Sequence, residues 1–294
     1  MSATDARYTA RVLAPATKAI SDGTGAQVPV RVYEPGAGDG RQYPQVPPGM
    51  GLVWVHGGGF VKGDLDMPEA HKTAESFAAC NATVVSVDYR LCQGGTTWPA
   101  PSDDVLTAWQ WSLDHAAELG IDPRKLILGG ASAGGNLVSG AVLRLLAASS
   151  NKLPSGVFLA YPTLHAVQAP TPESLQRLVA RLPDPTRFSA PNLLTMYENY
   201  LGGPVAGAPA AAIPGTADLG QLGGFPPTIM INGEADELRV SGEAFAASLQ
   251  QAGTSVETVT EPGTAHGHLN RPHEDAAART VHRVVDWANR NLST

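Results

Sequence analysis

Cysteine is scarce in this chain, because only Cys80 and Cys92 among its 294 residues carry a thiol. A disulfide scaffold needs many cysteines and is excluded, so both are expected to be free thiols. Charged residues make up 16% of the chain and hydrophobic residues 43%, a balance that excludes intrinsic disorder. The 32 glycines follow no fixed period, which excludes collagen. An ordinary globular protein remains, and one large α/β domain is expected at this length.

The sequence also lacks the basic runs and the long apolar runs that bind nucleic acids and membranes. Its 20 Lys and Arg stand against 27 Asp and Glu, a formal net charge of −7, and no basic cluster is present that could bind phosphates. No stretch approaches the roughly 20 apolar residues of a membrane span, and residues 1–20 contain no apolar core typical of a signal peptide. We therefore expect a soluble, cytoplasmic protein, either a monomer or a homodimer.

Short apolar runs rich in β-branched residues recur along the chain. Each is too short for a helix, and continuous hydrophobicity is typical of strands buried on both faces, as in a parallel sheet covered by helices. The predicted strands are 52–55, 83–87, 125–128, 156–160, 228–231 and 256–260. The predicted helices are 66–80, 102–119, 133–149, 241–251 and 272–291. Because strands and helices alternate, the sequence predicts an α/β fold with a mostly parallel central sheet flanked by helices.

The N-terminal region adds β-like patterns ahead of the first central strand. Residues 11–13 and 28–33 have strand-forming composition, and such pieces suit an antiparallel edge beside parallel strands. The chain up to about residue 25 is also expected to contribute to a cap.

The longest interruption of the alternating pattern is the segment 162–227. It contains two helical patterns, at 173–182 and 190–201, but no strand. An insertion of this length between two core strands is typical of a lid or cap. We therefore expect a single domain over 1–294, with its main cap at about 163–215.

The strongest local signal is the segment Gly130-Ala131-Ser132-Ala133-Gly134, which lies between a predicted strand and a predicted helix. A Gly-x-Ser-x-Gly pattern in this context indicates a nucleophile elbow, with Ser132 exposed at the carboxyl edge of the sheet. Glycine is needed at 130 and 134 because a side chain there would collide with the neighbouring strand and helix. The helix that follows places backbone N–H groups where an oxyanion would form. The alternative is a glycine-rich turn with an incidental serine.

A second glycine-rich segment, His56-Gly57-Gly58-Gly59, directly follows the first central strand. Three successive residues without a Cβ let main-chain amides approach a reacting carbonyl closely. With the elbow downstream, this loop and the amide of Ala133 would form the two halves of an oxyanion hole. Neither glycine run extends into a dinucleotide-binding or P-loop motif, so a nucleotide site is not indicated.

A serine hydroxyl needs a base to remove its proton and an acid to orient that base. In an α/β-hydrolase the acid and then the histidine follow the serine along the chain. Three carboxylates follow the strand 228–231, and we favour Asp236, although position alone leaves Glu234 and Glu237 open. His266 follows the last predicted strand and is the candidate base.

Histidines near the C-terminus offer a competing interpretation as a metal site. His266, His268 and His273 lie close together in sequence, but carboxylate or cysteine ligands at a matching spacing are not evident. The catalytic order already explains His266, so we expect no metal and no organic cofactor. His56 is expected to hold the glycine loop rather than to transfer protons.

Together these motifs resemble the hormone-sensitive lipase family of α/β-hydrolase esterases. The resemblance covers most of the chain from about residue 51, and the motifs fall in the family's order. They are His56-Gly57-Gly58-Gly59, Val87-Asp88-Tyr89-Arg90-Leu91, Pro99-Ala100-Pro101-Ser102-Asp103-Asp104 and Gly130-Ala131-Ser132-Ala133-Gly134-Gly135. The resemblance implies an α/β-hydrolase fold with a helical cap. It also implies a serine esterase that cleaves carboxylic esters with small or short-to-medium acyl groups through an acyl-enzyme.

The resemblance also assigns roles to individual residues. It gives the acid role to Asp236 and the base role to His266, both acting on Ser132. The oxyanion donors it implies are the amides of Gly58, Gly59 and Ala133. It implies structural roles, as ion pairs and helix starts, for Asp88, Arg90, Asp103 and Asp104.

Three departures from the family pattern concern the surroundings of the site. Ala131 replaces the usual acidic residue before the nucleophile, His268 stands where the family usually has Phe, and 92–95 interrupt the usual Ala-Pro-Glu stretch. They leave the catalytic groups intact and alter the wall around the acyl pocket. Candidate pocket residues from the glycine loop and the cap are Phe60, Tyr161, Leu164, Tyr197 and Tyr200.

The same triad serves other functions. An acyltransferase, or an enzyme that opens or forms lactones, would use the same three residues with an acceptor other than water. Amide hydrolysis is open for the same reason. A small-molecule receptor on the same fold is an alternative of a different class, but such a protein tends to lose the base, and His266 is present.

Overall fold

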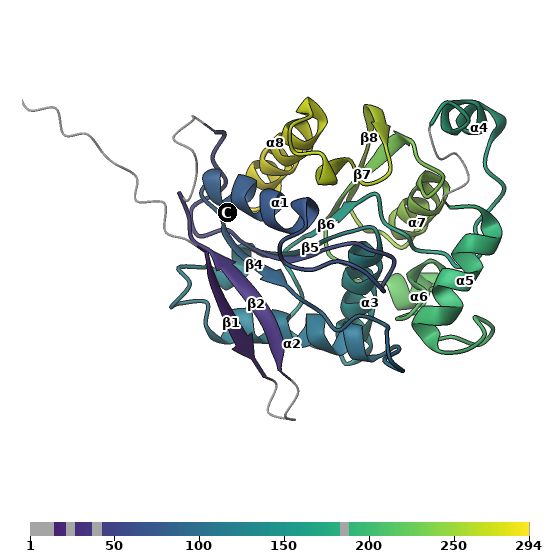
Figure 1. Ribbon diagram of the computed structural model, residues 1–294. Coiled ribbons are helices and arrows are strands. Elements are labelled where there is room, and N and C mark those ends of the chain that lie inside the picture. Colours follow the sequence, from purple (N-terminus) through teal and green to yellow (C-terminus); the bar gives the residue numbers. More distant parts are fainter. Residues whose placement is uncertain (1–14, 22–26, 37–42, 183–187, 294) are drawn as a thin grey trace, which may run out of the picture.

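One sheet of eight strands, in the order β1-β2-β4-β3-β5-β6-β7-β8, forms the centre of the molecule (Figure 1). The computed structural model describes residues 15–21, 27–36, 43–182 and 188–293, and the sheet lies within them. From β3 to β8 all pairs are parallel, whereas β2 is antiparallel to both β1 and β4. The strands are β1 (Ala16–Ile20), β2 (Val28–Tyr33), β3 (Gly51–Val55), β4 (Thr83–Val87), β5 (Leu126–Ala131), β6 (Val157–Ala160), β7 (Thr228–Ala235) and β8 (Val256–Ala265). The predicted mostly parallel sheet is confirmed.

All six predicted core strands are present, and three of them run further than the hydrophobic pattern indicated. β5 continues to Ala131, β7 to Ala235 and β8 to Ala265. The added residues are rich in glycine and polar side chains, so no apolar run marked them in the sequence. These extensions carry the chain to the carboxyl edge of the sheet, where the predicted catalytic loops begin.

The N-terminal edge differs from the prediction. β2 lies where a strand was expected, but β1 was not predicted because four of its five residues are exposed and form no buried pattern. The β-like piece at 11–13 lies outside the described residues. Residues 16–20 belong to the edge of the sheet, so this part of the expected cap at 1–25 is a strand.

Helices cover both faces of the sheet, in a three-layer arrangement (Figure 1). They are α1 (Pro68–Ala79), α2 (Ala100–Asp114), α3 (Ala133–Ala147), α7 (Arg239–Gln251) and α8 (Asp275–Asn291). Side chains alternate along β3: Leu52 and Trp54 pack with α1 and α8, whereas Val53 and Val55 pack with α2, α3 and α7. Continuous hydrophobicity along β3 therefore reflects burial on both faces, as expected for a central parallel strand.

The segment between β6 and β7 carries the predicted helical cap elements. The helices here are α4 (Glu173–Val179), α5 (Ala190–Leu201) and the unpredicted α6 (Leu219–Leu222), and a short 3₁₀ turn, η2 (Pro214–Thr216), precedes α6. Two further 3₁₀ turns lie outside this segment, η1 (Pro123–Lys125) before β5 and η3 (His268–Asn270) after β8. α5 buries Leu193, Tyr197 and Tyr200. The ring of Tyr200 stacks on that of Phe60, with centroids 3.9 Å apart. α5 is thereby fixed against the glycine loop.

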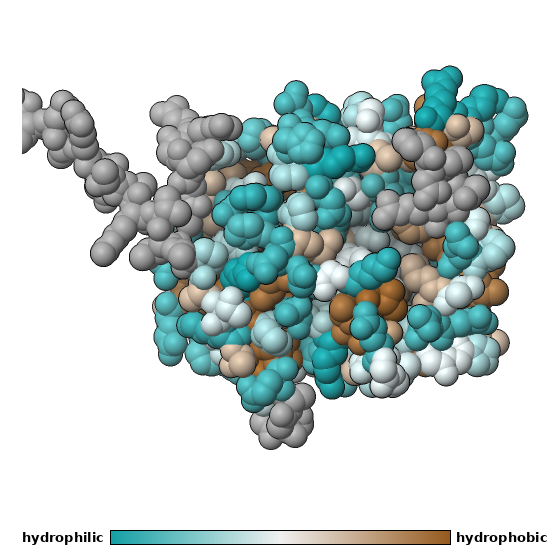
Figure 2. All heavy atoms as spheres, viewed as in Figure 1, coloured by the Kyte–Doolittle hydropathy of each residue, from teal (hydrophilic) through white to brown (hydrophobic). Residues whose placement is uncertain are grey.

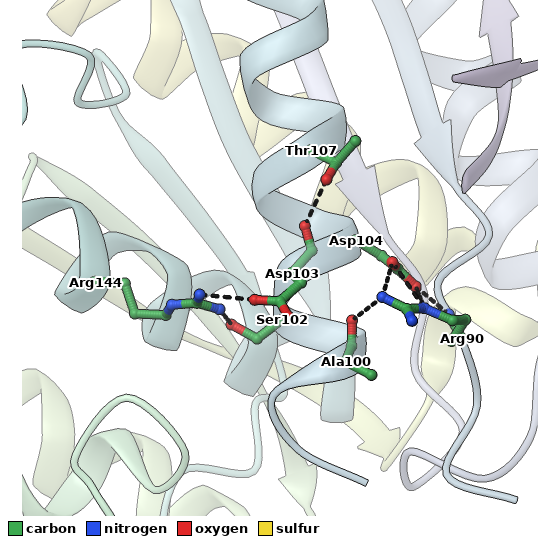
Figure 3. A network of polar contacts seen from close by, with 7 residues as sticks. All are labelled: Arg90, Ala100, Ser102, Asp103, Asp104, Thr107 and Arg144. Carbon is green, nitrogen blue, oxygen red and sulfur yellow. Dashed lines mark hydrogen bonds and ion pairs between the residues drawn. The ribbon is translucent and has the colours of Figure 1, made fainter. Parts of the chain in front are cut away.

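Two adjacent aspartates at the start of α2 tie this helix to different parts of the fold (Figure 3). Arg90, just after β4, donates from Nε and Nη2 to the carboxylate of Asp104, at 2.7 to 3.0 Å. Arg144 on α3 donates to Asp103 at 2.7 Å and to Ser102 at 2.9 Å. The structural role expected for Arg90 and the two aspartates is confirmed, since they join α2 to β4 and α3.

The face of the molecule drawn in Figure 2 is mostly hydrophilic, and hydrophobic residues appear there in separate small groups. Of the large hydrophobic residues in the described part of the chain, Val167 and Leu219 are exposed. Among these same residues, no helix has both the length and the apolar character needed to cross a membrane.

Candidate active site

Ser132 occupies a sharp turn between β5 and α3, with a φ of 52° that few residues other than glycine adopt. The two flanking glycines allow this turn. A Cβ on Gly130 would lie 2.5 Å from the backbone of Gly134, and one on Gly134 would overlap the carbonyl oxygen of Val55 on β3. The predicted need for glycine at both positions is confirmed.

His266 lies next to both Ser132 and Asp236. Its Nε2 is 3.0 Å from Ser132 Oγ, and its Nδ1 is 2.8 Å from Asp236 Oδ2. Since a carboxylate only accepts, Nδ1 carries the proton and Nε2 is free to accept one from the serine hydroxyl. The ring of His266 lies between those of Phe188, at 4.4 Å, and Tyr161, at 5.0 Å, which fix its orientation.

The two rival carboxylates of the β7 loop bind elsewhere. Glu234 accepts a hydrogen bond from the amide of Gly263 at 2.8 Å, and Glu237 accepts one from the amide of Phe188 at 2.8 Å. Glu234 thereby contacts β8, and Glu237 contacts the segment that precedes α5. Of the three candidates, the structure brings only Asp236 to the imidazole.

The glycine loop after β3 presents two main-chain amides to the same site. The amide of Gly57 donates to Glu69 at 2.6 Å, whereas within the described part of the chain no acceptor is bonded to the amides of Gly58, Gly59 or Ala133. Gly58 has a φ of 115°, and a Cβ there would overlap the carbonyl of Lys62. The free donors are therefore the second and third glycines, together with the first residue of α3.

His56 supports this loop from inside the protein. It is fully buried, its Nδ1 donates to the carbonyl of Gly57 at 2.7 Å, and its ring stacks on Tyr89 with centroids 4.5 Å apart. Burial lowers the pKa of His56, which keeps the imidazole neutral. Its contacts agree with the structural role expected for it.

The histidines considered as metal ligands have separate environments. His268 is buried and bonds to Thr280 at 2.8 Å, and burial lowers its pKa to about 4. His273 lies exposed near the start of α8. Over the residues that the structure describes, no group of three or more His, Cys, Asp or Glu side chains is arranged to hold a metal ion. Cys80 and Cys92 are both buried and free.

A family model described as alpha/beta hydrolase fold matches residues 52–270. This span covers the glycine loop, the elbow, the β7 loop and His266. The chain belongs to this family.

Relatives of this α/β hydrolase include proteins named as ester hydrolases. It is 37% identical to the carboxylesterase NlhH of Mycobacterium tuberculosis over 247 residues, which cover 83% of this chain and 72% of the relative. It is 32% identical to an ethyl acetate hydrolase of Pseudomonas putida over 252 residues, with coverages of 83% and 72%. The solved structure of brefeldin A esterase, a bacterial homologue of human hormone-sensitive lipase, matches with a TM-score of 0.80 and 26% identity over 99% of this chain and 81% of that one. The α/β hydrolase is therefore a carboxylesterase of the hormone-sensitive lipase type.

The substrate cavity of this esterase has a volume of about 820 Å³ and opens beside Ser132 and His266. One wall comes from α5, whose residues at spacings of three and four face the cavity. They are Asn192, Thr195, Met196 and Asn199. Lys62 and Arg271 also line the cavity.

The five side chains expected to contact substrate lie behind this cavity. Phe60, Tyr161, Leu164, Tyr197 and Tyr200 are each 0 or 1% exposed, and none lines the cavity. Their large apolar surfaces are used for packing between the cap, the glycine loop and α3. The hydroxyl of Tyr197, for example, accepts a hydrogen bond from Asn136 on α3 at 3.0 Å.

The residues that do line the cavity gave little signal in the sequence. Phe188 contacts the imidazole of His266 from a loop with no recognisable motif. The residues of α5 that line the cavity follow a helical spacing within 190–201, but substrate contact was predicted for the aromatic residues on the other face of this helix. Glu69, a buried carboxylate in the cavity wall, resembled an ordinary acidic residue in the first turn of a helix.

Proposed function

We propose that this esterase hydrolyses carboxylic esters in two acyl-transfer steps, with Ser132 as nucleophile. The observation that carries the proposal is the chain of contacts from Ser132 through His266 to Asp236, at 3.0 and 2.8 Å. Neutral His266 takes the hydroxyl proton on Nε2 as Oγ attacks the ester carbonyl carbon, and Asp236 stabilises the imidazolium through Nδ1. The alcohol leaves with that proton, and the acyl group stays on Ser132.

Deacylation repeats the same steps with water. His266 takes a proton from water as the water oxygen attacks the acyl carbon, and returns it to Oγ as the carboxylic acid leaves. In both tetrahedral intermediates the former carbonyl oxygen carries negative charge, for which the free amides of Gly58, Gly59 and Ala133 are the proposed donors. This scheme requires neither a metal nor an organic cofactor.

We further propose esters with small or short-to-medium acyl groups as the substrates. A cavity of about 820 Å³ can enclose a small ester completely. One relative is named for ethyl acetate, an ester of this kind. In this proposal the segment 163–215 acts as the cap, because α5 within it supplies one wall of the cavity.

Two measurements test the proposed function. A fluorophosphonate probe should label the protein once, and mass spectrometry should locate the adduct on Ser132. The Ser132→Ala variant should lose labelling and about five to six orders of magnitude in kcat, because residues of a triad act as a unit. A fast, saturable rate with p-nitrophenyl acetate to decanoate would support ester hydrolysis. Labelling at another residue would reject the assignment, and a silent ester screen with labelled Ser132 would favour a different acyl acceptor.

A further inference from the structure

The carboxylate of Glu69 lies in the wall of the catalytic cavity, yet the acyl-transfer scheme gives it no role. Glu69 is the second residue of α1 and is only 1% exposed. It accepts three hydrogen bonds: from the amide of Gly57 at 2.6 Å, the hydroxyl of Tyr161 at 2.6 Å and Nδ2 of Asn270 at 3.1 Å. A carboxylate buried this completely, beside a nucleophile, requires an explanation.

The three donors come from three separate loops around Ser132. Gly57 begins the glycine loop after β3, Tyr161 directly follows β6, and Asn270 lies in η3, shortly after His266. Asn270 also accepts a hydrogen bond from the backbone amide of Glu69, at 3.3 Å. One side chain on α1 therefore connects the oxyanion loop to the loop that carries the base.

The three partners of the Glu69 carboxylate are all hydrogen-bond donors. Two of them are N–H groups, which only donate. Burial, and next the charge of Glu69, raise the pKa of Tyr161 well above its usual value, so this hydroxyl also stays protonated and donates. No ion pair in the described part of the chain includes Glu69. Its charge is compensated instead by three donors and by the N-terminal end of α1, where the helix dipole favours an anion.

The contact with Gly57 lies directly beside the nucleophile. A Cβ placed on Gly57 would be 2.7 Å from Glu69 Oε1 and 3.0 Å from Ser132 Cβ, so only the Gly57 backbone separates the two side chains. By binding the first amide of the loop, the carboxylate fixes the position from which Gly58 and Gly59 extend into the cavity.

We propose that Glu69 is a positioning residue of this esterase: it holds the glycine loop and the His266 loop in place, so that the oxyanion donors and the base act on the same carbonyl group. The inference rests on the proposed function of Ser132. Glu69 itself transfers no proton and forms no bond to substrate.

The Glu69→Gln variant tests this role with almost no change in shape. Its amide oxygen can accept from one donor, but its NH₂ group opposes the others. Loss of one oxyanion donor lowers kcat by about 10²–10³, so displaced donors should lower it by about 10- to 100-fold while KM stays within about twofold. Affinity for a trifluoromethyl ketone, which forms an oxyanion adduct with the serine, should fall by the same factor as kcat/KM.

Two further variants make the test specific. Glu75→Gln makes the same chemical change on α1, at a half-exposed glutamate that pairs with Lys72 and His71 and does not line the cavity, and should leave kcat and ketone affinity unchanged. Tyr161→Phe removes one of the three donors and should give a smaller loss in the same direction.

The outcomes separate this inference from the proposed function. If Glu69→Gln retains the wild-type kcat, raises only KM, or weakens ketone binding less than it lowers kcat/KM, Glu69 is not a positioning residue. The same holds if a lower folded fraction, measured by circular dichroism at the assay temperature, explains the whole loss. Failure of the fluorophosphonate to label Ser132 in the wild-type protein would instead reject the proposed function itself.

Discussion

Asp236 is fixed by contacts on both of its carboxylate oxygens. Oδ2 meets His266, while Oδ1 accepts a hydrogen bond from the amide of Leu238 at 3.0 Å. Asp236 is 2% exposed, so water does not compete for the hydrogen bonds of its carboxylate. This arrangement selects the imidazole tautomer with its proton on Nδ1, which leaves Nε2 as a base toward Ser132.

The Asp236→Asn variant should lower kcat by about 10³–10⁴, because an amide in this place can donate to Nδ1 and so favour the wrong tautomer. The fold should be unchanged by circular dichroism. Glu234→Gln is the matched control two residues away: it keeps an oxygen acceptor for the amide of Gly263 and should retain kcat within about threefold. Equal losses in the two variants would contradict the assignment of the acid to Asp236.

The sequence predicted these residues to different degrees. Ser132 and His266 followed from a motif and from chain order. Asp236 did not follow from position, because Glu234 and Glu237 lie within two residues of it, and only the direction of each side chain decides which one meets the imidazole. The sequence did not predict the contacts of Glu69, because its three partners come from distant segments and no local sequence pattern indicates that they lie together.

At the scale of single elements, the bounds of α5 were predicted correctly, but the face of this helix that lines the cavity was not. The predicted helix 190–201 coincides with α5. Its aromatic residues Tyr197 and Tyr200 were expected to contact substrate, but large apolar surfaces are buried first, against Phe60 and α3. The smaller polar side chains on the opposite face are left to line the cavity. Helical period gives two faces, and tertiary packing decides which one is buried.

The anchor between β4 and α2 gives a prediction about stability. Asp104 has a side chain only 2% exposed, and its main partner is Arg90 (Figure 3). Arg90→Ala should lower the free energy of unfolding by about 2 kcal/mol, because the buried carboxylate loses its cation. The backbone amide of Arg90 still donates to it at 2.7 Å, and the guanidinium is 44% exposed, which together reduce the loss.

Urea unfolding followed by circular dichroism measures this effect. Arg124→Ala is the control, since the Arg124 side chain is 79% exposed and solvent screens its pair with Asp122, so the midpoint should stay close to that of the wild-type protein. kcat under native conditions should be unchanged in both variants because neither arginine reaches the cavity. Equal midpoints for the two variants would show that the α2 anchor does not stabilise the fold.

At the scale of the whole molecule, the predictable part of the fold is the part with a strong hydrophobic pattern. The parallel strands β3 to β7 are buried over the spans that the hydrophobic pattern predicted. The half-buried β8 and the alternation with helices also followed from the sequence. The edge strand β1 lacks such a pattern, because an edge exposes most of its side chains to water. The extended ends of β5, β7 and β8 were missed because their glycine and polar residues, which lead directly to Ser132, Asp236 and His266, form no apolar run.

Burial of neutral histidines affects the stability of the entire protein. Burial lowers the pKa values of His56, His165 and His268, to about 4 for His268. In the unfolded chain a histidine titrates near 6.5. Below that pH these histidines bind protons in the unfolded state but not in the folded state, so the free energy of unfolding falls as the pH drops. For His268 the stability is complete above about pH 6.5 and is lost progressively toward pH 4.

His268→Phe isolates this contribution, since Phe also carries a planar ring but does not titrate. Between pH 7 and pH 4 the free energy of unfolding of the wild-type protein should fall by about 3 kcal/mol more than that of the variant, because each pKa unit corresponds to about 1.4 kcal/mol. Urea unfolding at several pH values measures it. His273→Phe is the control: this imidazole is exposed in the folded protein, so its variant should follow the wild-type profile. Parallel profiles for His268→Phe and the wild-type protein would mean that the charged imidazole is accommodated in the folded state, by movement of η3 away from α8.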